Sequence, residues 1–218
     1  MIFALPRRRW RTTLVAMTEV PGARTIRRVC AFCGSNVGSD PAYRDAAREL
    51  GEEIVRRGWA LVYGGGRVGL MGVLADAALT AGGEVVGVIP EMLATKELLH
   101  TGATQMHVAP GMHARKALME ELADAFVALP GGFGTFEELL EIITWAQLGL
   151  HTKPIGLLNV RGFYDGLIGV FDHAIAEGFI KEKHRGLVVA ARTAAELLNR
   201  LETHEMPRVR KWIQVEET

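Results

Sequence analysis

The sequence predicts an α/β protein in which a mostly parallel, doubly wound sheet lies between two layers of helices. Short apolar runs alternate with segments of helix length over most of the chain. Several of these runs are apolar throughout, which is typical of parallel strands that are buried on both faces. The 218 residues, 49% of them hydrophobic and 25 of them glycine, are enough for one sizeable core and do not require two domains.

Strands and helices are expected to alternate with little linker between them. The expected strands are residues 28–33, 60–66 (running into a glycine turn), 84–90, 125–130, 153–159 and 187–190. The expected helices are residues 41–57, 70–81, 112–123, a long helix that follows the turn at 131–134 and runs to about 150, 162–178 and 193–204. An irregular polar stretch precedes the helix at 112–123. This order of elements predicts a Rossmann-like three-layer sandwich.

The helix ends carry the residues that favour starting and stopping a helix. Asp40 is expected to cap the first helix, with Pro41 at its first position, where a missing N–H does no harm. Gly58 closes that helix, and Gly82 with Gly83 ends the next one. These signals fix the boundaries of the first two helices.

One Rossmann-like domain is expected over residues 25–205. Residues 1–24 contain the basic run PRRRWR and are predicted to be a disordered or loosely attached extension, in which Met17 is a candidate native start. Residues 206–218 are predicted to be a loose tail. The 25 basic and 25 acidic residues balance, so no nucleic-acid or membrane partner is indicated. No apolar run in the extension is long enough to span a bilayer, and we expect a cytoplasmic protein.

The chain is organised around the stretch from Ala128 to Leu150, ALPGGFGTFEELLEIITWAQLGL. Pro130 cannot donate to a strand ladder and so ends the strand before it. The glycines at 131, 132 and 134 allow a sharp turn and a close approach of the backbone to a ligand. Thr135 caps the next helix or lies in its first turn, where free N–H groups and the helix dipole attract anions.

Glu137 and Glu138 are expected in the same first helical turn. Acidic residues at that position stabilise a helix by about 0.3–1 kcal/mol each, which suffices to explain one of them. Consecutive helical residues point about 100° apart, so the two side chains cannot face the same way. We therefore expect one carboxylate to face the glycine turn and to do acid or base work beside a bound anion.

Glycine turns follow three of the expected strands, at the edge of the sheet where ligands bind in such folds. They are Cys33-Gly34-Ser35-Asn36, Gly64-Gly65-Gly66 and Gly131-Gly132-Phe133-Gly134. A single turn of this kind can be a structural bend, but three together favour a phosphate-bearing ligand. The residues expected to contact it on these turns are Gly34, Ser35, Gly65, Gly66, Gly132, Phe133, Gly134, Thr135, Phe136, Glu137 and Glu138.

The second turn has an alternative interpretation. Residues 64–69 fit G-x-G-x-x-G between a strand and a helix, as in a dinucleotide-binding fingerprint, and Glu91 is a candidate ribose-binding acid. This motif alone does not account for the other two glycine turns. A nicotinamide-dependent dehydrogenase is thus the less favoured reading.

Four polar residues outside the turns are further site candidates. Arg115 offers a rigid fork that suits a carboxylate or phosphate and can hold Glu138 beside the substrate. Lys116 is its neighbour, with surface solvation as the ordinary alternative. Glu97 and Thr144 have equally ordinary explanations, namely a solvated acid and a threonine bonded to its own backbone.

Cys30 and Cys33 form a C-x-x-C motif within an apparent strand. Side chains three apart on a strand point to opposite faces, so we expect buried thiols, not a disulfide or a metal clip. The seven histidines lack metal-ligand spacing such as H-E-x-x-H. No metal and no cofactor are expected.

The helix after the third turn is apolar on nearly all sides. Phe136, Leu139, Leu140 and Ile143 form one stripe, and Ile142, Trp145 and Ala146 form another, which Leu148 extends. A helix that flanks a sheet has only one face to bury against its own domain. We therefore expect a homodimer with this helix at the interface.

The chain resembles the Lonely Guy (LOG) family, the cytokinin riboside 5′-monophosphate phosphoribohydrolases. PGGFGTFEE matches the family's P-G-G-x-G-T-x-x-E, and CAFCGSN, LVYGGGRVGLMG, GVIP, MHARK and ITWAQLGLHTKPIGLLN resemble its other blocks. The resemblance covers roughly residues 27–189. Some members carry the label lysine decarboxylase, but no lysine here has a recognisable pyridoxal phosphate setting.

The resemblance implies hydrolysis of the N-glycosidic bond of an adenine-type nucleoside 5′-monophosphate, such as AMP or a cytokinin nucleotide, to free base and ribose 5-phosphate. It implies that Arg115 and Glu138 are catalytic. It places substrate contacts on Glu97, Lys116, the loop 132–137 and Thr144. The alternative is a non-catalytic protein of the same fold that carries a nucleotide or cofactor.

Overall fold

The computed structural model describes residues 25–95 and 98–207. The expected extension with Met17, most of the expected tail, and Glu97 lie outside the described residues. The strands are β1 (Arg28–Phe32), β2 (Ala60–Tyr63), β3 (Val85–Pro90), β4 (Gln105–Ala109), β5 (Ala125–Ala128), β6 (Ile155–Leu158) and β7 (Val188–Ala191). The α-helices are α1 (Pro41–Arg56), α2 (Gly69–Thr80), α3 (Met112–Leu122), α4 (Phe133–Leu148), α5 (Asp165–Ala176) and α6 (Ala194–Thr203). Short 3₁₀ helices are η1 (Glu91–Leu93), η2 (Val160–Gly162) and η3 (Glu182–Leu187).

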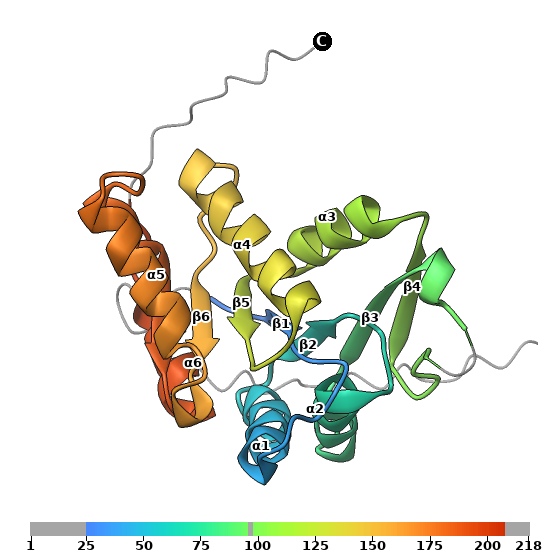
Figure 1. Ribbon diagram of the computed structural model, residues 1–218. Helices are drawn as coiled ribbons and strands as arrows, with labels where there is room; N and C mark the ends of the chain where they lie inside the picture. Colours follow the sequence, from blue (N-terminus) through green and yellow to red (C-terminus); the bar gives the residue numbers. More distant parts are fainter. Residues whose placement is uncertain (1–24, 96–97, 208–218) are drawn as a thin grey trace, which may run out of the picture.

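The seven strands form one sheet in the order β4-β3-β2-β1-β5-β6-β7, and every neighbouring pair is parallel. β1 lies in the middle, with Cys30 opposite Val62 of β2 on one side and Phe126 of β5 on the other. The chain winds outward from β1 to β4, returns to β5, and winds outward again (Figure 1). The predicted α/β class with a doubly wound sheet is confirmed, and the order of the strands reverses between β1 and β5.

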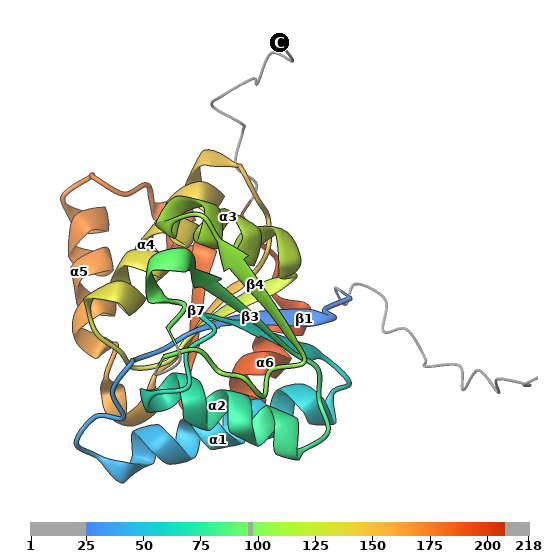
Figure 2. The same ribbon diagram turned by 90° about the vertical axis from the view of Figure 1, so that its right-hand side faces the viewer.

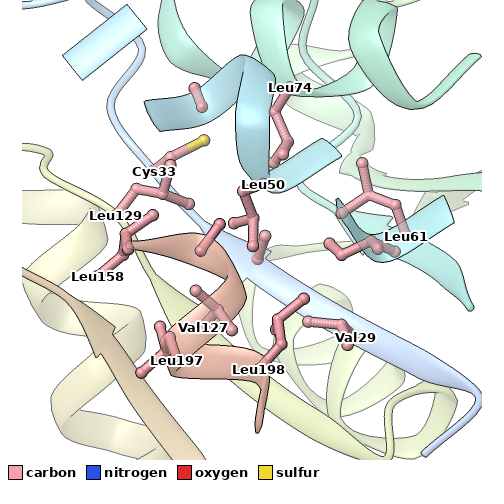
Figure 3. Close-up of a cluster of buried hydrophobic side chains, with 14 of the residues drawn as sticks. Val29, Cys33, Leu50, Leu61, Leu74, Val127, Leu129, Leu158, Leu197 and Leu198 are labelled. Atoms are coloured by element: carbon pink, nitrogen blue, oxygen red, sulfur yellow. The ribbon is translucent and has the colours of Figure 1, made fainter. Parts of the chain in front are cut away.

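The sheet lies between two layers of helices, as Figure 2 shows edge-on. On one face α1, α2 and α6 pack through leucines such as Leu50, Leu74 and Leu197, which meet Val29 and Val127 of the sheet (Figure 3). On the other face lie α3, α4 and α5. Complete burial of one such leucine stabilises the fold by about 1.5–3 kcal/mol.

The edge strand β4 differs from the sequence prediction, which gives residues 105–109 as part of an irregular polar stretch. Its sequence QMHVA is neither fully apolar nor strictly alternating. As the outermost strand it pairs on one side only, with β3. Gln105 and Val108 are exposed there. An edge strand needs no continuous apolar run, which is why hydrophobic pattern failed to identify it.

The two cysteines behave as predicted. Cys30 packs in the core on the α3–α5 side of the sheet, whereas Cys33 packs on the α1–α2 side. Both thiols are free and buried, and burial raises the pKa of each. Within the described residues, no helix has the length and apolar character needed to cross a membrane.

Candidate active site

The three glycine turns meet at the carboxyl-terminal edge of the sheet, where backbone hydrogen bonds join Gly34 of the first turn to residues next to the other two. The amide of Gly34, after β1, donates to the carbonyl of Pro130, after β5, at 3.1 Å. The amide of Leu70, at the start of α2, donates to the carbonyl of Gly34 at 3.0 Å. The loop after β1 therefore holds the other two turns in a fixed relation at the point where the strand order reverses.

A cavity of about 490 Å³ opens between these turns. Glycines from the second and third turns, together with Ser35, form its polar backbone wall. Arg115 of α3 and Glu138 of α4 contribute its buried charged groups. The remaining lining residues are Ala31, Phe32, Cys33, Val68, Met71, Ile89, Pro90, Leu93, Leu98, Met112, Phe133, Thr135 and Glu137.

Three helices begin at this cavity, and no side chain caps any of them. The N-cap positions are Val68 for α2, Gly111 for α3 and Gly132 for α4. Of the helices that start elsewhere, α1 and α6 are capped by the side chains of Asp40 and Thr193, whereas α5 has no side-chain cap. The first N–H groups of a helix need an acceptor, and the helix dipole makes an anion a good one. The cavity is thus suited to a phosphate.

The glycines of the third turn serve two different purposes. A Cβ on Gly131 would lie 2.1 Å from Thr135 Oγ1 and 2.9 Å from the Gly34 nitrogen, so this position allows the turns to pack closely. A Cβ on Gly132 or Gly134 would meet no atom within 4 Å. Packing within the chain does not require glycine at those two positions, whereas a ligand on the adjacent amides would.

Arg115 and Glu138 form a buried ion pair on the floor of the cavity. Arg115 Nη1 lies 2.8 Å from Glu138 Oε1, and each side chain is 9% exposed. Arg115 Nε also donates to the carbonyl of Val88 at 3.1 Å, and its guanidinium covers Gly64, whose Cβ would lie 2.5 Å from Nη2. Burial raises the pKa of Glu138, and the charge of Arg115 counteracts part of that rise.

Lys116 does not line the cavity, although it directly follows Arg115. Its ammonium group bonds to Glu137 and lies 2.9 Å from Glu141 Oε2, with only 6% of the side chain exposed. Burial alone would lower the pKa of Lys116, but its bonds to the two carboxylates raise it. Lys116 is therefore occupied by acidic partners on α4.

The expected position of the two glutamates on α4 was wrong by one turn. The helix begins at Phe133 with Gly132 as its N-cap, so Thr135 lies in the first turn while Glu137 and Glu138 lie in the second. The helix begins two residues before Thr135, so Gly134 of the glycine turn already lies within it. As predicted, the two side chains diverge: Glu138 is buried against Arg115, whereas Glu137 is half exposed.

The structure places the expected contact residues in two groups. Those that line the cavity are Ser35, Gly66, Arg115, Gly132, Phe133, Gly134, Thr135, Glu137 and Glu138. Those that do not line it are Gly34, Gly65, Lys116, Phe136 and Thr144. Gly34 borders a smaller cavity alongside, Phe136 stacks on Phe163, and Thr144 donates to the carbonyl of Leu140. Glu97 belongs to the residues left undescribed.

The apolar wall of the cavity was not anticipated. Met71, Leu93, Leu98 and Met112 come from four separate segments and meet only in the folded chain. Met71 and Met112 lie in the stretches LVYGGGRVGLMG and MHARK that resemble the LOG family, and this resemblance is the one sequence signal for the wall. Beside the wall, Phe133 is 94% exposed at the mouth of the cavity.

Two other features of the described residues bear on where a ligand could bind. A groove of about 870 Å³ lies at the opposite edge of the sheet, but its Asp124 carboxylate already accepts from the amides of Arg27 and Arg28. No group of three or more histidine, cysteine or acidic side chains in the described part of the chain is arranged to hold a metal ion. The cavity between the glycine turns remains the best candidate.

Comparison with known proteins gives both a family and a fold. The family model described as "Possible lysine decarboxylase" matches residues 71–201. Cytokinin riboside 5′-monophosphate phosphoribohydrolase LOG of Oryza sativa subsp. japonica is 53% identical over 179 residues, which are 82% of this chain and 74% of the rice protein. The Arabidopsis thaliana phosphoribohydrolase LOG1 is 50% identical over 186 residues, covering 85% and 87% of the two chains.

Among solved structures, the molybdenum cofactor carrier protein of Chlamydomonas reinhardtii superposes with a TM-score of 0.62 at 24% identity. The match covers 80% of this chain and 97% of the carrier. A molybdenum cofactor binding protein of Rippkaea orientalis gives a TM-score of 0.61 at 21% identity, with 79% and 94% covered. At this identity the likeness shows a shared fold and nothing about the ligand.

Proposed function

We propose that this chain, which belongs to the LOG family of cytokinin riboside 5′-monophosphate phosphoribohydrolases, hydrolyses the N-glycosidic bond of adenine-type nucleoside 5′-monophosphates. The products are the free base and ribose 5-phosphate. The observation that carries the proposal is the buried pair of Arg115 and Glu138 in a cavity bounded by three helix starts that no side chain caps. This arrangement combines an anion site with one acidic side chain beneath it.

The amides of the third glycine turn bind the 5′-phosphate in this proposal. No side chain caps the N-terminus of α4, and the space beside Gly132 and Gly134 is open. A phosphate held there positions the ribose, because a fixed end of the substrate limits how the rest of it can move. The apolar side chains of Met71, Leu93 and Met112 then offer the base a surface to pack against.

Glu138 acts on the sugar. When the bond between C1′ and the base nitrogen breaks, its electron pair leaves with the base and positive charge develops on the ribose ring. The Glu138 carboxylate stabilises this charge and orients the water that adds to C1′. The raised pKa of Glu138 suits it to accept a proton from that water as the water oxygen bonds to C1′, and transfer of this proton to the leaving base restores the carboxylate.

Arg115 keeps Glu138 ionised and in place. Its guanidinium is anchored to the carbonyl of Val88 and packed on Gly64, so the carboxylate cannot turn away without losing its partner. A buried carboxylate without a positive neighbour would take up a proton. The arginine thus opposes the effect of burial on Glu138.

The direct test is a product assay. The protein is incubated with AMP, with N6-prenylated AMP and with the matching nucleosides, and the free base and ribose 5-phosphate are separated and quantified. We expect release from the monophosphates and much less from the nucleosides, which lack the group that the glycine turns hold. Binding of the nucleotides without release of base would instead identify a carrier, and an absorbance change dependent on NAD would identify a dehydrogenase.

A homodimer that pairs through α4 is the second part of the proposal. Leu140 on α4 is 41% exposed in the single chain, and Leu150 just beyond the helix is 51% exposed. The neighbouring helix α5 has the apolar sequence DGLIGVFDHAIA but contains no fully buried residue. Exposed apolar side chains on these two helices are candidates for an interface, and a second copy is the occupant that we propose. A cytoplasmic location, proposed from the two free buried thiols, completes the assignment.

A further inference from the structure

A buried tyrosine lies behind the third glycine turn without lining the cavity. Tyr164 is the N-cap residue of α5, and its side chain is fully buried. The hydroxyl donates to the carbonyl of Leu129 at 2.6 Å. Burial raises the pKa of Tyr164, so the hydroxyl stays protonated and remains a donor. Because Leu129 directly precedes Pro130, this bond fixes the backbone at the entrance of the turn.

The backbone at that entrance is held from two sides. On the β1 side, the amide of Leu129 donates to the carbonyl of Phe32 at 2.9 Å, and the carbonyl of Pro130 accepts from the amide of Gly34 at 3.1 Å. On the β6 side, the ladder with β5 ends one residue before Leu129. A buried carbonyl needs a donor, and beyond the end of this ladder the hydroxyl of Tyr164 supplies it.

The ring of the same tyrosine contacts the other end of the turn. It lies edge-on to Phe136, with the ring centroids 6.3 Å apart and 83° between the ring planes. The amide of Phe136 donates to the carbonyl of Gly132 at 3.1 Å, a bond that closes the first turn of α4. Tyr164 therefore touches the chain where it enters the glycine turn and again where it leaves it.

Tyr164 is itself held in place by polar contacts. Its backbone amide donates to Asn159 Oδ1 at 2.8 Å, and Asn159 Nδ2 donates to Asp165 Oδ1 at 2.7 Å. The amide of Asn159 donates to the carbonyl of Ala191, the last residue of β7, at 2.8 Å. These bonds tie the tyrosine to β7 and to the start of α5, so its position depends on parts of the fold outside the cavity.

We infer that Tyr164 is a positioning residue for the phosphate site: acting through Leu129 and Phe136, it fixes the third glycine turn so that the amides of the turn face the cavity. The effect on phosphate affinity rests on the proposed function. The effect on the order of the turn does not.

The experiment compares Tyr164→Phe with Tyr63→Phe. Tyr63, the last residue of β2, precedes the second glycine turn and is also fully buried, but its hydroxyl has no hydrogen-bond partner among the described residues. We expect the dissociation constant for AMP to rise about 2- to 10-fold in Tyr164→Phe, as for the loss of one hydrogen bond. The dissociation constant for adenosine, which has no phosphate, should stay unchanged. Tyr63→Phe should bind both ligands like the native protein.

The ratio of the two affinities separates positioning of the phosphate site from a general effect on the fold. A tyrosine that only stabilises the fold would change the affinities for AMP and adenosine together or not at all. If calorimetry gives the native ratio for Tyr164→Phe, the inference is overturned. If the native protein binds neither ligand, the proposed function fails, and the order of the turn decides the inference.

Hydrogen exchange without ligand measures that order. NMR follows the amides of Gly34 and Phe136, whose bonds to Pro130 and Gly132 hold the turn, relative to the amide of Leu61 in β2. We expect both amides to exchange faster relative to Leu61 in Tyr164→Phe and at native rates in Tyr63→Phe. This result supports the inference even if the native protein releases no base. Native relative rates in Tyr164→Phe would overturn it, whatever the activity assay gives.

Discussion

Arg115 Nη1 lies 2.8 Å from Glu138 Oε1, with both side chains about nine-tenths buried at the base of a cavity. A buried ion pair is a poor source of stability, because removing two charges from water costs about as much as their attraction returns. Its location beside three helix starts that no side chain caps fits the role it has in the proposed function, which is to hold one carboxylate under the substrate phosphate.

Replacement of that carboxylate should separate binding from turnover. Glu138→Gln keeps the size and an acceptor oxygen but cannot stabilise positive charge on the ribose or take a proton from water. We expect release of base to fall by roughly 10²- to 10⁴-fold. AMP affinity, measured by calorimetry, should be little changed.

Glu49→Gln, an exposed substitution on α1, serves as the control and should behave like the native protein. If Glu138→Gln released base at the native rate, the role assigned to this residue would have to be abandoned.

Replacement of the arginine should change the pH dependence. Burial raises the pKa of Glu138 and Arg115 opposes that rise, so Arg115→Met should raise this pKa further. If turnover needs the ionised carboxylate, the acid limb of kcat moves to higher pH. In the variant, the folded protein holds the Glu138 proton more tightly than the unfolded chain does. The resulting contribution to the free energy of unfolding is fully present below the ordinary pKa of a glutamate, and it is lost as the pH rises through the raised pKa of the folded variant.

The free energy of unfolding of Arg115→Met should therefore fall relative to the native protein as the pH rises, by up to about 3–5 kcal/mol once the unpaired carboxylate is forced to ionise. Urea unfolding between pH 4 and pH 8 measures this difference. A constant difference over that range would show that Arg115 does not control the ionisation of Glu138.

Much of the fold followed from local pattern. The apolar strands of the sheet interior, the glycine turns after β1, β2 and β5, and the helix start at Asp40 each depend on residues close together in the sequence, and all are present. β4 is different, because its only requirement is a partner strand supplied by residues some twenty positions earlier. The pattern of neighbouring residues in the sequence does not reveal that β3 is available as a partner.

The candidate site shows the same difference between features set by local sequence and features set by long-range packing. The divergence of Glu137 and Glu138 follows from helical geometry, and the pairing of Arg115 with Glu138 is expected both from the fork of the arginine side chain and from the family resemblance. The partners of Lys116 depend on how α3 packs against α4, which brings Glu141 to it from another part of the chain. The apolar wall with Leu93 likewise exists only once distant segments meet.

Alanine substitutions in the third glycine turn should distinguish a glycine that is needed for packing from one that is needed for ligand binding. In Gly131→Ala the new methyl group would lie 2.1 Å from Thr135 Oγ1, and the overpacking should lower the free energy of unfolding by about 1–3 kcal/mol. In Gly132→Ala the methyl group meets no atom within 4 Å, and the backbone φ of −97° suits alanine. That variant should stay as stable as the native protein but lose affinity for AMP.

Urea unfolding and an AMP titration on both variants check this contrast. Native affinity in Gly132→Ala would mean that the phosphate does not approach this amide, and the anion site would have to be moved to the starts of α2 or α3.

The assembly is tested on the exposed side of α4. Leu140 is 41% exposed in the single chain and does not line the cavity, so a change there alters an interface without touching the site. Burying the aspartate of Leu140→Asp between two subunits would require desolvating a charge, which should weaken the dimer strongly. Val108→Asp, on the exposed edge strand β4, is the matched control and should leave assembly unchanged.

Analytical ultracentrifugation at micromolar concentration should show a dimer for the native chain and the control, and predominantly monomer for Leu140→Asp. A native chain that sediments as a monomer would refute the dimer, and a dimeric Leu140→Asp would place the interface away from this face of α4.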